Sequence, residues 1–219
     1  MPGLSPAGRE LALRFLQPRS RVECALATAI MASQLDKLDK LEKPPSDALP
    51  PAQRLLPLWL AIATAGGLGY GPVASGTWGS AGGVVLHLGL VTLLGAGALA
   101  APLYLLVIVA ITLIGVRAAD VAERHYARRD DGRIVIDEVA GQLIALAPLV
   151  LFAPAQTRHP VYLAAGFLLF RLFDIWKPGP VRAAERGFEG GWGVMLDDVV
   201  AGLLAALATG LLVAVGAFA

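Results

Sequence analysis

The sequence of 219 residues has few of the side chains from which the sites of soluble proteins are commonly built. Cys24 is the only cysteine, which excludes an internal disulfide framework and a metal site made of cysteines. The three histidines, His87, His125 and His159, share no metal-ligand spacing, so we interpret each as a hydrogen-bonded or solvated side chain. The net charge is +1, and no basic cluster is interleaved with aromatic residues. The sequence therefore indicates no nucleic-acid partner.

Charged residues are also scarce, at 16%, whereas 56% of the residues are hydrophobic. An average soluble domain has about 25% charged and about 45–50% apolar residues. The apolar residues fall in long runs, and a membrane-spanning helix needs about 20 of them. Because lipid offers no hydrogen-bond partner to the backbone, such runs are helical. The composition therefore predicts an all-α, polytopic helical membrane bundle.

The apolar runs predict about five spans. The expected spans are 81–98, 100–116, 139–153, 161–176 and 196–219. The run at 55–69 is short and rich in glycine, so we expect a re-entrant or interfacial segment there. Together these runs predict a membrane-embedded domain over 55–219.

The first 54 residues differ from the rest, because they hold eight of the eighteen Lys and Arg residues. The motif LDKLDKLEK at 35–43 places a thin apolar stripe on a charged helix, and a proline-rich break follows at 44–51. We therefore predict a polar and amphipathic extension with a proline-rich linker over 1–54, in which 35–43 is a candidate contact for a partner.

The charges of the connecting segments predict the orientation in the membrane. Segments 117–136 and 177–195 carry eight Lys and Arg residues, whereas the turns on the opposite face and the C-terminal end carry only Arg158. Because short cytoplasmic loops are enriched in Lys and Arg, we expect the two charged segments to face the cytoplasm.

Three separate chain segments bring carboxylates to this expected cytoplasmic face. The acids are Asp137, Glu138, Asp174, Asp197 and Asp198. Acids near the start of a helix also complement its macrodipole, which is the structural alternative for all of them except Asp174. Arg171 and Lys177 each lie three residues from Asp174, roughly on one helix face. Since ionisable residues at a membrane edge are commonly functional, their convergence predicts a site.

Clustered carboxylates without histidine or thiolate favour a hard cation, Mg²⁺ first. We expect Asp137, Asp197 and Asp198 to be its ligands. Mg²⁺ commonly shares phosphate ligands with cationic side chains, and Arg171 and Lys177 would bind the phosphate.

The glycine-rich segment 76–80 adds a further candidate for phosphate binding, with Thr77 and Gly79 as its donors. Glycine-rich turns ahead of helices expose N–H groups that bind phosphate oxygens. Close packing of helices in the membrane is the alternative role of these glycines.

Three classes of function fit these residues. The first is a Mg²⁺-dependent enzyme that acts on a lipid-linked phosphate by hydrolysis or transfer. The others are an ion or proton transporter and a non-catalytic membrane subunit. Transport is less favoured because the acids gather at one face. A CDP-alcohol transferase would need Asp-Gly-x-x-Ala-Arg, and the chain departs from that pattern after 131–133.

Four sequence blocks resemble the signature blocks of the phosphatidylglycerophosphatase A family. They are GTWGS at 76–80, IVIDEVAG at 134–141, FRLFDIWKP at 170–178 and GGWGVMLDD at 190–198. The resemblance covers about 57–219, and the first 55 residues match nothing in the family. The chain departs from the family pattern at Ser75, where the family has proline, and at Gly179, where it has an aromatic residue.

The resemblance implies a Mg²⁺-dependent phosphatase that converts phosphatidylglycerophosphate to phosphatidylglycerol in the bacterial inner membrane, with its active site facing the cytoplasm. Its partners would be the phospholipid substrate and membrane lipid. The five acids would form the catalytic site, with Arg171 and Lys177 facing the phosphate. Glu138 or Asp174 would orient a water or protonate the leaving group, and an aspartyl-phosphate intermediate is the alternative.

Overall fold

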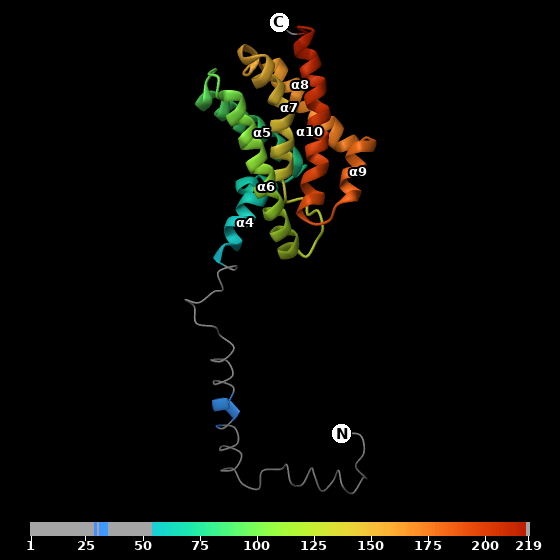
Figure 1. Ribbon diagram of the computed structural model, residues 1–219. Coiled ribbons are helices and arrows are strands. Elements are labelled where there is room, and N and C mark those ends of the chain that lie inside the picture. The colour runs from blue at the N-terminus through green and yellow to red at the C-terminus, as the bar shows by residue number, and fades with distance from the viewer. Residues whose placement is uncertain (1–28, 30, 35–53, 218–219) are drawn as a thin grey trace, which may run out of the picture. The chain divides into compact units, whose positions relative to one another are not determined.

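The computed structural model describes residues 29, 31–34 and 54–217, which form helices and connecting turns and no strand (Figure 1). The all-α fold class is thus confirmed for these residues. Contacts divide the chain into two units, Met1–Arg54 and Leu55–Ala219. The proposed partner segment 35–43 and nearly all of the extension lie outside the described residues, so the predictions for them stay predictions.

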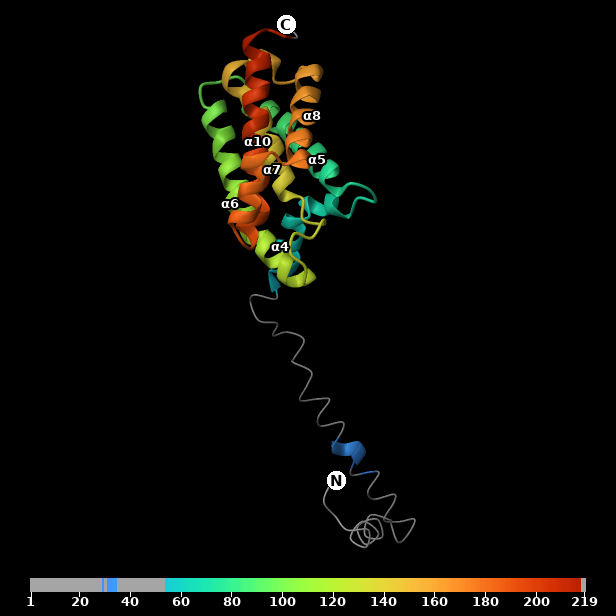
Figure 2. The same ribbon diagram turned by 90° about the vertical axis from the view of Figure 1, so that its right-hand side faces the viewer.

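The second unit is a bundle of helices that run alternately up and down (Figures 1 and 2). In chain order its elements are α4 (Leu56–Ala63), the 3₁₀ helix η1 (Ala65–Tyr70), α5 (Ser75–Leu94), α6 (Ala100–Tyr126), α7 (Ile136–Phe152), the 3₁₀ helix η2 (Pro154–Gln156), α8 (Pro160–Trp176), α9 (Gly179–Gly187) and α10 (Gly191–Ala214). The starts of α5, α7 and α10 and the ends of α6 and α8 lie at one end of the bundle, which we call the site end.

Helix α7 lies at the centre of this bundle and is buried along almost its whole length. Helix α10 packs along it on one side and α5 on another, while α6 and α8 complete the enclosure (Figure 2). The first turn of α7, which carries Asp137 and Glu138, is therefore surrounded by other helices at the site end.

The backbones of α7 and α10 touch where two glycines meet. A Cβ atom on Gly202 would lie 2.5 Å from the carbonyl oxygen of Gly141 and 3.0 Å from its Cα. A Cβ on Gly141 would lie 2.7 Å from the carbonyl oxygen of Asp198. Residues four apart share a helix face, so Asp137 and Asp198 lie one turn before these glycines on the contact side of their helices. The glycine contact therefore brings the two acids together.

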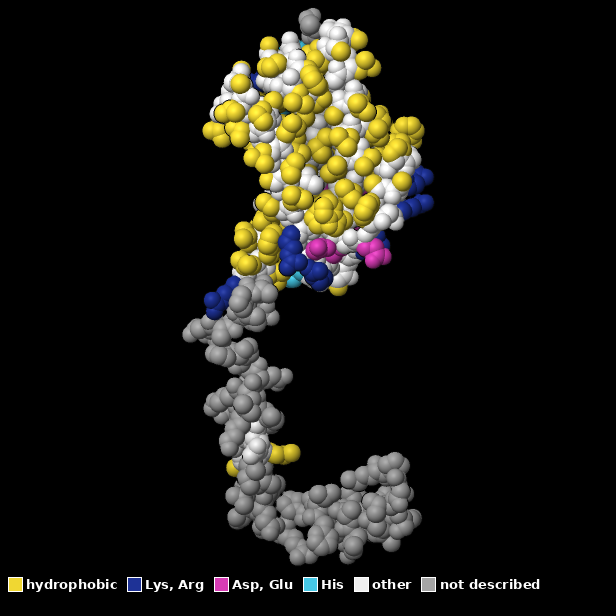
Figure 3. Space-filling view, in the orientation of Figure 1, with side chains coloured by type: hydrophobic (Ala, Val, Ile, Leu, Met, Phe, Trp, Pro, Cys, Tyr) yellow, Lys and Arg dark blue, Asp and Glu magenta, His cyan; other side chains and the backbone are white. Residues whose placement is uncertain are grey.

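Three of the described helices, α5, α6 and α10, are long and apolar enough to cross a membrane. Helices α7 and α8 have 17 residues each, about 26 Å at 1.5 Å per residue, slightly less than a hydrocarbon layer of about 30 Å. Five spans are therefore not confirmed. Hydrophobic side chains cover the sides of the bundle in Figure 3, whereas charged ones gather at the site end and beside α9.

The observed helices extend beyond the predicted apolar runs at the site end. Helix α6 continues to Tyr126 instead of ending at 116, because small residues keep one side buried to Ala122 while charged residues occupy the other. Helix α10 starts at Gly191 instead of 196, and α9 forms inside 177–195, which was expected to be a loop. Apolar runs in the sequence do not reveal these helical turns, because the turns lie outside the uninterrupted apolar stretches.

The short apolar run predicted at 55–69 forms two consecutive pieces, α4 and η1. The second piece, η1, is kinked at Gly66 and Gly67, which have φ values of +70° and +104° that side chains disfavour. At the end of α4, the carbonyl of Ala63 accepts a hydrogen bond of 2.9 Å from the N–H of Val135. This segment therefore fixes the loop that leads into α7.

At the opposite end of the bundle, His87 links three parts of the chain. Its Nδ1 atom lies 2.8 Å from the hydroxyl of Tyr104, and its Nε2 atom lies 2.9 Å from the carbonyl of Thr157. The ring is fully buried, and buried polar groups in proteins are nearly always hydrogen-bonded. The interpretation of His87 as a hydrogen-bonded side chain is confirmed.

The glycine contact predicts that Gly202→Ala destabilises the bundle, because the added methyl group would overlap the backbone of α7. We expect a loss of about 1–3 kcal/mol, measured as a lower apparent melting temperature in detergent. Gly89→Ala is the matched control, since Gly89 lies in α5 with open space around it. Equal melting temperatures for the two variants would contradict the contact.

Candidate active site

The first turn of α7 presents two acids to the interior of the site end. Asp137 is buried, and its Oδ1 atom accepts a hydrogen bond of 3.1 Å from the backbone N–H of Glu138. Acids are favourable in the first turn of a helix. In the preceding loop, Arg133 forms an ion pair of 2.6 Å with Asp131, and its hydrogen bond lowers the pKa of that carboxyl. The loop that leads into α7 is thus stabilised by its own ion pair between Arg133 and Asp131.

Helix α10 carries its two acids well inside the helix. It begins at Gly191, whose N–H donates a 2.6 Å hydrogen bond to Asp120 of α6. Asp197 and Asp198 are its seventh and eighth residues and are only 7% and 3% exposed. The macrodipole acts within the first turn, so it does not account for this pair. The structural alternative, in which all four acids complement a helix start, therefore does not hold for Asp197 and Asp198.

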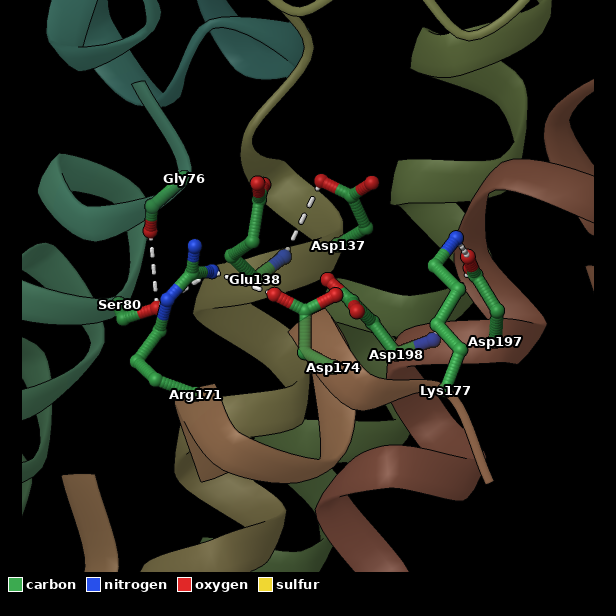
Figure 4. Close-up of polar contacts among 9 residues, drawn as sticks. All are labelled: Gly76, Ser80, Asp137, Glu138, Arg171, Asp174, Lys177, Asp197 and Asp198. Carbon is green, nitrogen blue, oxygen red and sulfur yellow. Dashed lines mark hydrogen bonds and ion pairs between the residues drawn. The ribbon is translucent and has the colours of Figure 1, made fainter. Parts of the chain in front are cut away.

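Three carboxylates meet at the crossing of α7 and α10. Asp137, Glu138 and Asp198 each offer an oxygen atom, and these atoms all lie within 4.8 Å of one another (Figure 4). We call these residues the acid cluster. Like charges at this separation repel, and burial increases the cost of the charged forms. In addition, Glu138 Oε2 is buried without a hydrogen-bond partner. Oxygen donors that converge in this way fit a hard divalent cation such as Mg²⁺.

Asp197, expected as a metal ligand, has a different partner. Its carboxylate lies 2.9 Å from Lys177 Nζ, which also lies 2.9 Å from Glu185 of α9. Burial opposes the charge of Lys177, yet the two ion pairs raise the pKa of its amine. In return, the hydrogen bond from Lys177 lowers the pKa of the Glu185 carboxyl. Two of the three predicted ligands, Asp137 and Asp198, lie in the acid cluster together with Glu138, and metal binding by the predicted ligands stays a prediction.

Arg171 and Lys177 do not lie on one helix face as expected, but on opposite sides of the acids (Figure 4). Helix α8 ends at Trp176, and Lys177 adopts a left-handed conformation with φ of +46° that turns the chain toward α9. The prediction assumed that the helix continues through Lys177, whereas α8 ends one residue before it.

On the other side of the acids, Arg171 forms an ion pair of 2.6 Å with Asp174, one turn later in α8. The pair compensates an acid at the unfavourable end of a helix. Arg171 Nη1 also lies 3.5 Å from the hydroxyl of Ser80, which donates a 2.8 Å hydrogen bond to the carbonyl of Gly76. These contacts hold the guanidinium between α5 and α8.

Gly76 allows a carboxylate and this guanidinium to pack directly against the start of α5. A Cβ atom there would collide with Glu138 Oε1 and would lie 2.9 Å from Arg171 Nη1. A side chain at this position would therefore displace the acid or the base, whereas glycine lets both lie beside the backbone.

The two predicted phosphate donors of segment 76–80 lie in different surroundings. Gly79 is buried, and its Cβ position is 2.9 Å from Val135 and 3.1 Å from Glu138, so close packing accounts for it. Thr77 is exposed, and its N–H donates to the carbonyl of Ala74 at 2.8 Å. Phosphate binding by Thr77 and Gly79 stays a prediction.

Sequence reasoning did not single out Gly76, Ser80 or Gln142. Gln142 is fully buried four residues after Glu138, and both its side-chain oxygen and its nitrogen lack a partner among the described residues. A polar residue one turn from an acid inside an apolar run was the available signal. Gly76 and Ser80 belong to the glycine-rich segment 76–80, which the sequence marked only as a whole, because their own contacts depend on what α7 and α8 bring against them.

Comparison with known proteins places this site in a family. The sequence profile of the family described as Phosphatidylglycerophosphatase A matches residues 61–213. Phosphatidylglycerophosphatase A of Escherichia coli is 36% identical over 148 residues, which cover 68% of this chain and 79% of that protein. The Haemophilus influenzae protein of the same name is 35% identical over 143 residues, 64% of this chain and 81% of that protein.

A third relative carries a different name. A protein of Bacteroides thetaiotaomicron, named as a candidate phosphatidylinositol-3-phosphatase, is 40% identical over 142 residues, 65% of this chain and 85% of that protein. No solved structure matches the chain significantly. The profile match spans all the helices that form the site, and this chain is therefore an enzyme of the phosphatidylglycerophosphatase A family of phosphatases.

Proposed function

We propose that this protein removes the terminal phosphate of phosphatidylglycerophosphate at the cytoplasmic face of a bacterial inner membrane, with Mg²⁺ as its cofactor. The family supports the phosphatase activity and the substrate. The observation that carries the proposal is the acid cluster, whose oxygens lie within 4.8 Å of one another beside a fixed arginine. Clustered oxygen donors next to a guanidinium suit a phosphate bound together with a hard cation.

Asp137, Glu138 and Asp198 would hold the Mg²⁺ ion, while Asp197 stays paired with Lys177. When bound, Mg²⁺ would polarise the phosphoryl oxygens and balance the charge that builds up on them. The unpaired oxygen of Glu138 supports this role, because a buried carboxylate oxygen requires a partner.

The protein's own groups would position the phosphate and move the proton. Arg171 would bind phosphate oxygens next to the acid cluster, and Asp174 would hold its guanidinium in place. Attack by water on phosphorus breaks the bond to the glycerol oxygen, which must gain a proton. Asp174, or an oxygen of Glu138 that does not bind the metal, would accept a proton from the attacking water and pass one to the glycerol oxygen. Attack by an aspartate of the cluster, with a phosphoenzyme, is the alternative course.

The surface at the site end supports a position at the membrane interface. Trp78, Trp176 and Trp192 all lie at this end, with 47%, 65% and 46% of their surfaces exposed. Tryptophan is enriched where lipid meets water, and Lys and Arg are enriched on the cytoplasmic side. We further propose that α7 and α8 cross the membrane inside the bundle, which would give five spans.

A second lipid substrate is a specific alternative. The relative named as a candidate phosphatidylinositol-3-phosphatase matches 142 residues of this chain. Both names describe the hydrolysis of a phosphate monoester on a lipid headgroup. The acid cluster suits either substrate, so the remainder of the headgroup must decide between them.

Phosphate release from phosphatidylglycerophosphate tests the proposed chemistry. We expect phosphate release by the purified protein in lipid to require Mg²⁺, to be lost when a chelator is added and to recover when Mg²⁺ is returned. Asp198→Asn should lower kcat by about 100-fold or more, because it removes a charge on which the metal depends. Glu189→Gln, at an exposed acid of the same end, is the control and should be unaffected. Activity that survives both the chelator and Asp198→Asn would contradict the metal site.

Substitution of Arg171 by lysine tests the phosphate contact. Lysine keeps the charge but loses the planar fork, so we expect a loss in kcat/KM of about tenfold or more. Arg182→Lys on α9, whose side chain is exposed, should match the wild type. If the two variants behave alike in steady-state kinetics, Arg171 does not bind the phosphate through its fork.

A further inference from the structure

A second polar pocket opens at the site end, next to the acid cluster. Its volume is about 530 Å³, within the usual range of small-molecule sites of about 300–1,000 Å³. Five charged side chains line it: Arg129, Asp130, Glu185, Arg186 and Asp197. We call it the α9 pocket, since α9 supplies two of these residues. The proposed chemistry at the acid cluster uses none of the five.

The α9 pocket and the acid cluster share a wall. Asp197 lines the pocket and Asp198 belongs to the cluster, and they are consecutive residues of α10, with Cα atoms about 3.8 Å apart. Lys177 lies at the boundary, where it bridges Asp197 and Glu185 at 2.9 Å each. A ligand whose terminal phosphate occupies the cluster can thus extend into the pocket past Lys177.

The charges of the α9 pocket suit a molecule with both an anionic group and hydroxyl groups. Lys177 compensates Glu185 and Asp197, and the two arginines add positive charge beside Asp130. Arg129 is held in place by a hydrogen bond of 3.1 Å to the carbonyl of Phe188, which uses one of its five N–H groups. Guanidinium groups bind phosphate oxygens, and carboxylates accept hydrogen bonds from hydroxyls.

The position of the pocket relative to the membrane suits a lipid headgroup. Phe188 and Trp192, which flank the start of α10 next to the pocket, expose 50% and 46% of their surfaces. Tryptophan marks the interface between lipid and water, and Phe188 adds an exposed apolar ring beside it. At that level lies the phosphodiester that joins a phospholipid's headgroup to its acyl chains.

From these four features we propose that the α9 pocket binds the part of the lipid headgroup beyond the scissile phosphate, namely its hydroxyl-bearing linker and its phosphodiester. Arg129 and Arg186 bind the phosphodiester, and Asp130 and Glu185 accept hydrogen bonds from the linker. The α9 pocket then determines which phosphorylated lipid the enzyme hydrolyses. This assignment rests on the proposed function and names the part of the protein that selects the lipid substrate.

Arg186→Gln tests the assignment, because Arg186 lines the pocket in the last turn of α9 and is exposed. Arg182→Gln is the matched control on the same helix, since it removes an equal charge outside the pocket lining. Full-length protein in lipid vesicles is given phosphatidylglycerophosphate, phosphatidylinositol 3-phosphate or phosphatidic acid. Phosphatidic acid has a phosphate monoester but lacks the linker and the phosphodiester.

We expect Arg186→Gln to raise KM for phosphatidylglycerophosphate about tenfold at unchanged kcat, because it removes one charge-assisted hydrogen bond to the lipid. Arg182→Gln should leave KM unchanged, and neither substitution should change the apparent affinity for phosphatidic acid, whether it is hydrolysed or only competes. Arg129→Gln should repeat the effect of Arg186→Gln and change the preference between the two headgroup lipids.

Three results would overturn the assignment while the proposed function stands. They are equal KM values for Arg186→Gln and Arg182→Gln, an equal rise in KM for phosphatidic acid, and a loss confined to kcat. Failure of the wild type to hydrolyse any of the three lipids with Mg²⁺ would instead overturn the proposed function, and the pocket assignment with it.

Discussion

The contact between the backbones of α7 and α10 is the constraint on which the site depends. Gly141 and Gly202 let the two helices approach until a Cβ on one would overlap the other. Because both helices start at the site end, Asp137 and Asp198 each lie one turn before their glycine on the contact side. The electrostatic cost of assembling buried carboxylates is therefore imposed by packing between apolar helices, and the proposed cation would relieve it.

Much of this arrangement could be predicted from the sequence, because apolar runs and charge patterns report on helices in a membrane. The loop charges predict which ends of the apolar runs face the same side of the membrane. Asp137, Glu138 and Asp198 lie at those ends, so their proximity could be predicted. The role of Asp197 could not, since its partner Lys177 leaves the helix in a left-handed turn that spacing does not reveal. Helix α9 was missed because it is polar and lies outside any apolar run.

The site end combines two kinds of electrostatic compensation at adjacent residues of one helix. On one side of α10, the buried charge of Asp197 is balanced by Lys177, a side chain of the protein itself. On the other side, the oxygens of the acid cluster converge without an equivalent bridging lysine among the described contacts. A carboxylate paired with lysine and a carboxylate of the acid cluster thus lie next to each other, so the proposed reactive centre would border a wall held by an ion pair.

The equal spacing of acid and glycine in the two helices restricts how the sequence can change over evolution. An insertion in the turn between α7 and α8 lengthens a loop and leaves both intervals intact. A single residue inserted between Asp198 and Gly202 would rotate the acid by about 100° around the helix and remove it from the contact face. The length of this interval therefore tolerates less change than the apolar residues within it, which can exchange for one another at similar volume.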